Sequence, residues 1–282
     1  SKEIISLFGK INAPNGYLFE NEYLKKFVKP EWLGFHQGNK FSSEKDYLKA
    51  IEVYLQGIKV SSSPNNWALI YSLAKAQMAI GDINGAKENI IQCIKLLENL
   101  SELNKLLILI RASLISFYQQ DYWEGSNLLE KAYQKLKEEP PSYLALILRS
   151  LALVNVGEFT QAQKAFQESE ELRVGLLENS ADKYFLERPK YGLEEWNSLL
   201  EEAITYCEKA YQISGLTGNN QRNKYFLLFQ GLLEDFMGNL ETAIKAYKSF
   251  LQDLGPSLSS QIVKPSLIYE KIGNLYEKIN DP

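Results

Sequence analysis

The sequence has very little of what metal sites and enzymes are usually built from. Only one of its 282 residues is a histidine, His36, so a mechanism or a metal site that needs two histidines is excluded. The stretch Gly215–Gly218 lacks the lysine and the preceding strand of a phosphate-binding loop. Adjacent carboxylates such as Glu170–Glu171, Glu194–Glu195 and Glu201–Glu202 diverge around a helix, which indicates solvated faces. We therefore expect no catalytic residue, no metal site, no cofactor and no enzymatic activity.

Cysteines and long apolar runs are also scarce. Cys93 and Cys207 lie far apart in apolar helical patterns, which predicts two small buried hydrophobic residues and neither a disulfide framework nor a zinc site. The longest apolar run, Leu106–Ile110, is far too short to cross a bilayer, and no signal-peptide pattern is visible. Two free thiols fit a reducing compartment, so a cytoplasmic location without membrane insertion is expected.

Excess charge of either sign is absent as well. The 31 basic and 35 acidic residues give a formal net charge of −4, which provides no basic field for phosphates. Nucleic acid is therefore not expected as a partner. The hydrophobic content of 45% is ample for a packed core.

The clearest positive signal is a repeated pair of amphipathic helices, best seen in Tyr225–Pro256. Its apolar residues recur at three- and four-residue spacing on both sides of a turn at Met237–Leu240, and Gly231 leaves room for a neighbouring helix. Such a pair cannot bury both of its faces alone and must stack on further pairs. Corresponding turn positions recur along the chain at Lys45, Gly81, Gln120, Gly157 and Gly238.

The first unit carries the most specific match to a known pattern. It has a small residue and an aromatic in its first helix, a turn, and alanine, tyrosine and proline in and after its second helix: Gly38, Asn39, Phe41, Asp46, Tyr47, Ala50, Tyr54 and Pro64. This pattern resembles a tetratricopeptide repeat (TPR), although Lys45 and Gly57 depart from it. The turns are about 36 to 40 residues apart, with a double interval before Gly238, slightly longer than the roughly 34-residue period of that family. The resemblance implies an all-α, right-handed α-solenoid of about six helix pairs with a C-terminal capping helix.

We expect three parts along the chain. Residues 1–30 are interpreted as an N-terminal capping segment or a docking arm for another chain, and residues 31–261 as the repeat array. Residues 262–282 are interpreted as a capping helix with Lys271, Glu277 and Lys278 outward, or as part of a longer array. The fifth repeat, around 179–214, is irregular because Pro189 interrupts its first helix, whereas Glu195–Ser214 suits its second. This irregularity is either a bend or inserted loop, or a harmless variation in length.

The resemblance also implies a class of function. First helices of this family line a concave groove, so the chain is expected to be a non-catalytic protein–protein interaction scaffold or adaptor that binds a protein or peptide partner there or along the second helices. The apolar groove also permits self-association. The alternative is a regulatory sensor module that binds a peptide or small ligand and controls an output domain outside this chain.

Matching to the family pattern assigns the partner-binding groove to specific side chains. The predicted groove residues are His36, Asn39, Tyr71, Lys75, Arg111, Tyr118, Phe229 and Asp235. Lys75 and Arg111 are the strongest candidates, because no role in core packing is expected for them.

Overall fold

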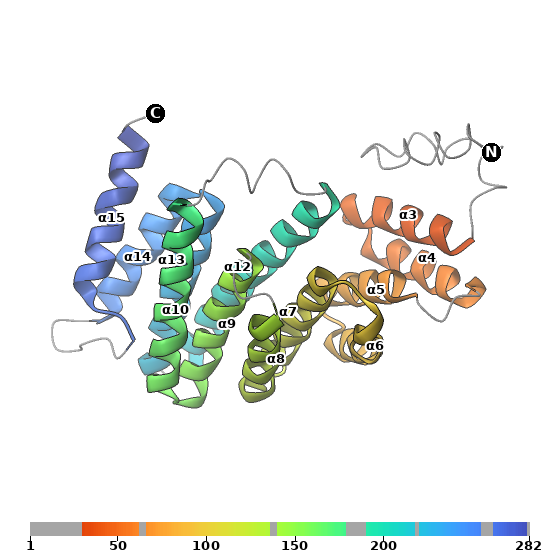
Figure 1. Cartoon of the computed structure of the whole chain (residues 1–282), viewed down its shortest axis with the longest axis horizontal. Helices are drawn as coiled ribbons and strands as arrows, with labels where there is room; N and C mark the ends of the chain where they lie inside the picture. Colours follow the sequence, from red (N-terminus) through yellow and green to blue (C-terminus); the bar gives the residue numbers. More distant parts are fainter. Residues whose placement is uncertain are drawn as a thin grey trace. The chain divides into compact units, whose positions relative to one another are not determined.

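The structure, a computed structural model, describes residues 30–61, 66–135, 140–178, 190–217, 220–254 and 262–280. Every regular element within these ranges is helical, so the prediction of an all-α helical-repeat fold is confirmed. The expectations for residues 1–29, for Asn179–Arg188 and for Pro189 fall outside the described residues. The helices, labelled in Figure 1, divide into two compact units. The boundary lies between Asn99 and Leu100.

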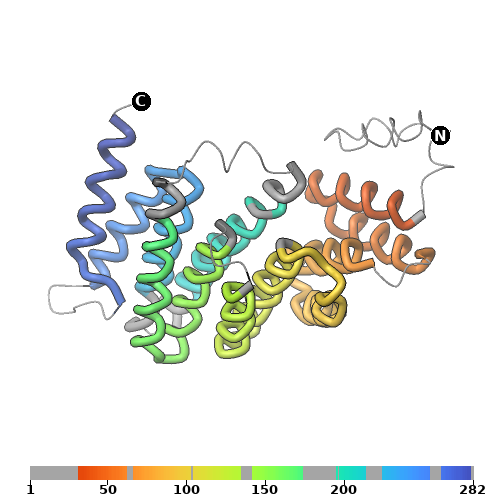
Figure 2. Tube along the Cα trace, in the orientation of Figure 1, coloured from red at the N-terminus to blue at the C-terminus, as the bar shows by residue number. Residues whose placement is uncertain are grey.

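Unit 1 consists of two consecutive helix pairs, which follow one another in the orange part of the trace in Figure 2. They are α3 (Pro30–Ser43) with α4 (Tyr47–Val60), and α5 (Trp67–Ala79) with α6 (Ile83–Lys95). The second helix of each pair begins after an aspartate cap: Asp46 accepts a hydrogen bond from the backbone N–H of Lys49, and Asp82 from that of Gly85. The buried Phe35 of α3 belongs to the same core cluster as residues of α4 and α5.

Unit 2 contains three further pairs and two additional helices within the described residues. The pairs are α7 (Glu102–Tyr118) with α8 (Tyr122–Lys135), α9 (Pro140–Val156) with α10 (Phe159–Glu178), and α13 (Asn220–Met237) with α14 (Leu240–Leu254); the others are α12 (Lys190–Thr217) and α15 (Pro265–Asn280). Helices α8, α10, α12 and α13 all pack against α9. This explains why α9 is apolar nearly all round: from residue 142 to residue 154 only Arg149 escapes full burial.

The turn inside each of the five pairs has one residue in the left-handed region. The backbone angle φ is +62° at both Lys45 and Gln120, and it is +83°, +91° and +82° at Gly81, Gly157 and Gly238. In all five turns the next backbone N–H donates to the carbonyl five residues earlier at 2.9 Å, which closes the first helix as a Schellman motif. All five turn positions predicted from the sequence are therefore confirmed.

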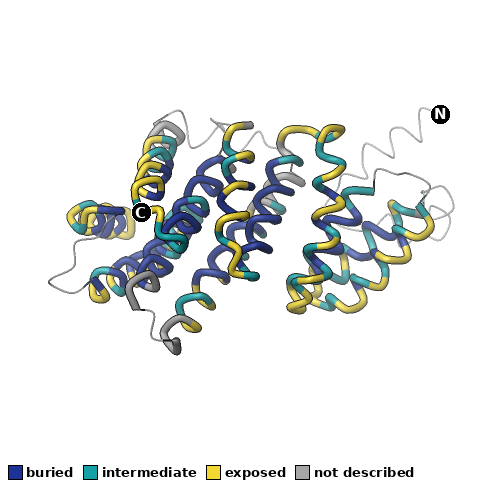
Figure 3. The backbone as a smooth tube through the Cα atoms, turned by 90° about the horizontal axis from the view of Figure 1, so that it is seen from below, coloured by how far each residue is buried: buried dark blue, intermediate teal, exposed yellow. Residues whose placement is uncertain are grey.

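Glycines mark where the two helices of a pair approach most closely. A Cβ atom on Gly231 would lie 2.6 Å from two ring carbons of Tyr247, which is fully buried on α14. A Cβ atom on Gly38 would lie 2.2 Å from the ring of Tyr54 on α4, at the same separation in sequence. The predicted close approach at Gly231 is thus confirmed. Figure 3 shows buried residues along the helix sides that face one another and exposed residues along the outer sides.

The last helix differs from the expected solvating cap at one position. Glu277 and Lys278 of α15 are exposed as predicted, but Lys271 is only 4% exposed and its Nζ donates to Glu170 of α10 at 2.5 Å. The expectations that Lys271 points outward and that Glu170 lies on a solvated face are therefore wrong. The carboxylate of Glu170 on α10 compensates the buried charge of Lys271.

Candidate partner-binding face

Four of the predicted groove residues lie in unit 1, on two neighbouring first helices. His36 and Asn39 belong to α3, Tyr71 and Lys75 belong to α5, and α3 packs against α5. Tyr71 is buried, and Asn39 accepts a hydrogen bond from the hydroxyl of Tyr54 at 2.6 Å. His36 and Lys75 remain half-buried. The α3–α5 face, defined by these residues, therefore offers His36 and Lys75 more readily than the other two.

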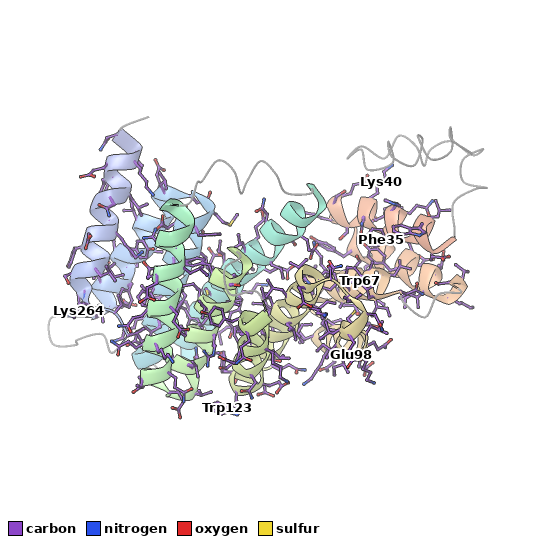
Figure 4. All side chains as sticks on the ribbon, viewed as in Figure 1. Phe35, Lys40, Trp67, Glu98, Trp123 and Lys264 are labelled. Atoms are coloured by element: carbon purple, nitrogen blue, oxygen red, sulfur yellow. The ribbon has the colours of Figure 1, made fainter. Side chains whose placement is uncertain are left out.

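Trp32 belongs to this face as well, although the sequence analysis missed it. Its side chain is 54% exposed and its ring stacks on His36, with centroids 6.2 Å apart and an interplanar angle of 27°. Burial lowers the pKa of His36 below its ordinary value, which favours the neutral form of the imidazole. The available signal was Pro30, a residue favoured in the first turn of a helix, which places Trp32 one turn before His36. Figure 4 labels Phe35 on α3 and Trp67 on α5, the two helices that carry the face.

The corresponding face of α7 in unit 2 is covered by the chain's own helix α12. Arg111 is fully buried, and its guanidinium donates to Glu202 at 2.6 Å and to Glu195 at 2.8 Å. The expectation that Arg111 has no role in packing is therefore wrong. The interpretation of Glu195 and Glu202 as solvated carboxylates is wrong for the same reason.

Aromatic contacts extend this cover toward the C-terminal end of α7. The ring of Tyr206 on α12 lies 5.1 Å from that of Tyr118 and 5.5 Å from that of Phe117, measured between centroids. The hydroxyl of Tyr206 donates to that of Tyr122 at 2.7 Å. Burial raises the pKa of Tyr118 to about 12. The predicted second helix of the fifth repeat thus occupies the α7 face, which sequence matching had assigned to a partner.

The remaining two predicted residues lie on α13 in quite different surroundings. Phe229 is fully buried in the core of unit 2. The side chain of Asp235 is 7% exposed and lies 3.6 Å from Arg173 of α10. Tyr71, Arg111 and Phe229 are therefore buried and lie on no surface, and partner binding by any of the eight residues stays a prediction.

The described residues hold little reactive chemistry. Cys93 and Cys207 are buried free thiols, as predicted, and burial raises the pKa of Cys93 to about 12 and that of Cys207 further above its ordinary value. Among the residues that the structure describes, no three His, Cys, Asp or Glu side chains gather where they could hold a metal ion. Of the helices described, none is both long enough and apolar enough to cross a membrane.

Comparison with known proteins gives a likeness of fold. No known protein-family profile matches the chain, and no characterised protein matches its sequence significantly. One similar solved structure is MamA, at 16% identity over 80% of this chain and 92% of that one, with a TM-score of 0.46. A tetratricopeptide repeat protein from Parabacteroides merdae is 14% identical over 88% of this chain and 100% of that one, with a TM-score of 0.45. TTC0263, a thermophilic TPR protein from Thermus thermophilus, is 14% identical over 88% of this chain and 99% of that one, with a TM-score of 0.42. All three are similar to this chain in overall fold.

Proposed function

We propose that this chain is a non-catalytic interaction module that holds a segment of a protein partner on the α3–α5 face of unit 1. The observation that carries the proposal is the exposed Trp32 ring stacked on the half-buried His36. Tryptophan is enriched among the residues that dominate binding energy at protein interfaces, because one rigid ring offers a large contact area. The face would therefore bind an apolar or aromatic anchor residue of the partner.

The packing beneath the rings of Trp32 and His36 favours a role in binding over a chance exposure of Trp32. Phe35 is buried beneath them, with its ring 5.5 Å from that of His36 and 6.3 Å from that of Trp32 in edge-on orientations. A partner residue would thus meet side chains that are already held in place, which reduces the entropy lost on binding.

Unit 2 supports the choice of face by elimination. The α7 face is already filled by α12 through two ion pairs and an aromatic cluster. A partner could reach Arg111 there only by displacing its contacts with both Glu195 and Glu202. Trp32 on the α3–α5 face is 54% exposed, so a partner can contact it without breaking an ion pair among the described residues.

Two tryptophans with equal exposure provide a matched experiment. Trp32 on α3 and Trp123 on α8 are each 54% exposed. We would identify a partner by affinity capture with the wild-type chain, purify it, and titrate it against Trp32→Ala and Trp123→Ala. The proposal predicts at least a tenfold weaker Kd, about 1.4 kcal/mol, for Trp32→Ala and an unchanged Kd for Trp123→Ala. An unchanged Kd for Trp32→Ala would overturn it.

A further inference from the structure

A polar pocket in unit 2 has features that neither the fold nor the proposed partner face explains. It lies among α10, α13 and α15, has a volume of about 440 Å³, and falls within the usual range for small-ligand sites. Five charged side chains and an amide line it: Arg173, Asp235, Lys271, Asn274, Glu277 and Lys278.

Arg173 keeps unused hydrogen-bonding capacity in the pocket. Its Nε lies 3.5 Å from Glu170, and its Nη1 lies 3.6 Å from Asp235. Both distances exceed the roughly 2.7–2.9 Å of a hydrogen-bonded ion pair. The buried Nε has no hydrogen-bond partner among the described residues, and the nearest oxygen of Glu170 accepts from Lys271 instead. A planar guanidinium in this state matches the two oxygens of a carboxylate.

The other charges of the pocket determine which second charged group a ligand needs besides a carboxylate. Arg173, Lys271 and Lys278 are balanced by Asp235 and Glu277 in the lining and by Glu170 beneath it. A ligand with negative charge alone would be attracted by Arg173 but repelled by Asp235. These two side chains lie only 3.6 Å apart. A ligand with an ammonium beside its carboxylate would pair with both. The ammonium and the carboxylate of an α-amino acid are attached to one carbon atom, so their separation is comparable to that between Arg173 and Asp235.

Two buried hydroxyl groups add a second, independent observation. Tyr143 and Tyr247 are fully buried, and neither hydroxyl has a hydrogen-bond partner among the described residues. Burial raises the pKa of both tyrosines well above the ordinary value. The charges of Glu170, Arg173 and Asp235 also influence these two pKa values, so both hydroxyls lie near the same charged cluster. Buried polar atoms without partners are uncommon and require an explanation. Hydroxyl groups that lack partners beside this cluster add to its unmet hydrogen-bonding capacity.

We propose that this pocket binds a small zwitterion of the α-amino acid class, with its carboxylate on Arg173 and its ammonium on Asp235. Leu275 supplies an apolar wall for part of the side chain. The site is separate from the α3–α5 face, so the two proposals stand or fall independently.

Calorimetric titration of the full chain tests this pairing. Each of the twenty free L-amino acids is titrated in turn, and the best binder is compared with propionate and ethylamine, which each carry one of the two charges. We expect at least one amino acid to bind with a Kd below about 1 mM, and both single-charge probes to bind at least tenfold more weakly. Failure of all twenty to bind, or equal binding of propionate, would overturn the proposal.

Variants assign the binding to the pocket. Arg173→Gln is expected to weaken binding at least tenfold, whereas Arg149→Gln is expected to leave it unchanged. Arg149 is a matched control because it is 20% exposed, compared with 21% for Arg173, and is paired with Glu130 elsewhere in unit 2. Asn274→Ala alters an exposed residue of the lining, so it tests the pocket even if Arg173→Gln fails to fold, and it is expected to weaken binding several-fold. Unchanged binding in both pocket variants would refute the assignment.

Discussion

The contact between Gly231 and Tyr247 gives the most quantitative prediction of the fold. In Gly231→Ala the new Cβ atom would lie 2.6 Å from two ring carbons of a tyrosine that is fully buried and cannot swing away. Overpacking of this kind costs about 1–3 kcal/mol. Replacing a glycine by alanine inside a helix contributes about 1 kcal/mol in the opposite direction. The expected net destabilisation is therefore about 0–2 kcal/mol, and Gly231→Leu should cost more.

A second helical glycine separates the two contributions. Gly273 lies within α15, and a Cβ atom there would meet nothing within 4 Å. Gly273→Ala should therefore stabilise the chain by up to about 1 kcal/mol. The difference between the two alanine variants isolates the packing cost, about 1–3 kcal/mol.

The assay is urea unfolding followed by circular dichroism, with the slope of the transition compared among variants to detect any loss of two-state behaviour. Gly231→Ala should lower the free energy of unfolding less in the Tyr247→Leu background than in the wild-type chain, because the ring that the new Cβ atom meets is absent there. Equal effects of Gly231→Ala and Gly273→Ala, or no coupling with Tyr247→Leu, would refute the close approach.

Three further predictions concern turns, the α12 contact and pH. Lys45→Gly and Gln120→Gly remove a side chain from a left-handed turn residue, so each should stabilise the chain by about 0.5–1 kcal/mol; a lower melting temperature would contradict this. Arg111→Ala leaves two carboxylates without their buried partner and should cost about 3–5 kcal/mol in urea unfolding, whereas a loss under about 1 kcal/mol would mean that α12 does not rely on it. Burial raises the pKa of Cys93 and of Tyr118 to about 12, from ordinary values of 9.0 and 10.0, so the folded chain keeps protons that the unfolded chain releases. Stability should therefore be full below about pH 9. It should fall by up to about 1.4 kcal/mol per pH unit through Cys93 above about pH 9, and by up to the same slope again through Tyr118 above about pH 10, until about pH 12. A melting temperature that rises between about pH 9 and 11 would contradict the sign.

Local features of the fold were predictable from the sequence because they depend on a few neighbouring residues. The left-handed turns at Gly81, Gly157 and Gly238 follow from the freedom of glycine, and the repeat period then located Lys45 and Gln120 without a glycine. The space at Gly231 was predictable for the same reason, since a missing side chain in an apolar stripe leaves room for another helix.

Contacts between distant parts of the chain were not predictable in this way. Arg111 meets Glu195 and Glu202 across more than eighty residues, and no local pattern records that α12 would lie on α7. Lys271 was predicted to point outward because it is a polar residue on the last helix. Its side chain instead donates to Glu170 on α10, a contact that the local pattern does not record. Helical periodicity shows which residues share a face and does not show what covers that face.

The central claim is that a partner segment lies on the α3–α5 face, and photo-crosslinking tests it most directly. A benzophenone amino acid is placed at Lys75 on α5 in one variant and at Glu52, an exposed residue of α4, in another. Each variant is irradiated with the captured partner, and the joined peptides are identified by mass spectrometry. The account predicts crosslinks from position 75 to one short partner segment and none from position 52. Crosslinks from position 52 alone would move the partner to the second helices and contradict the account.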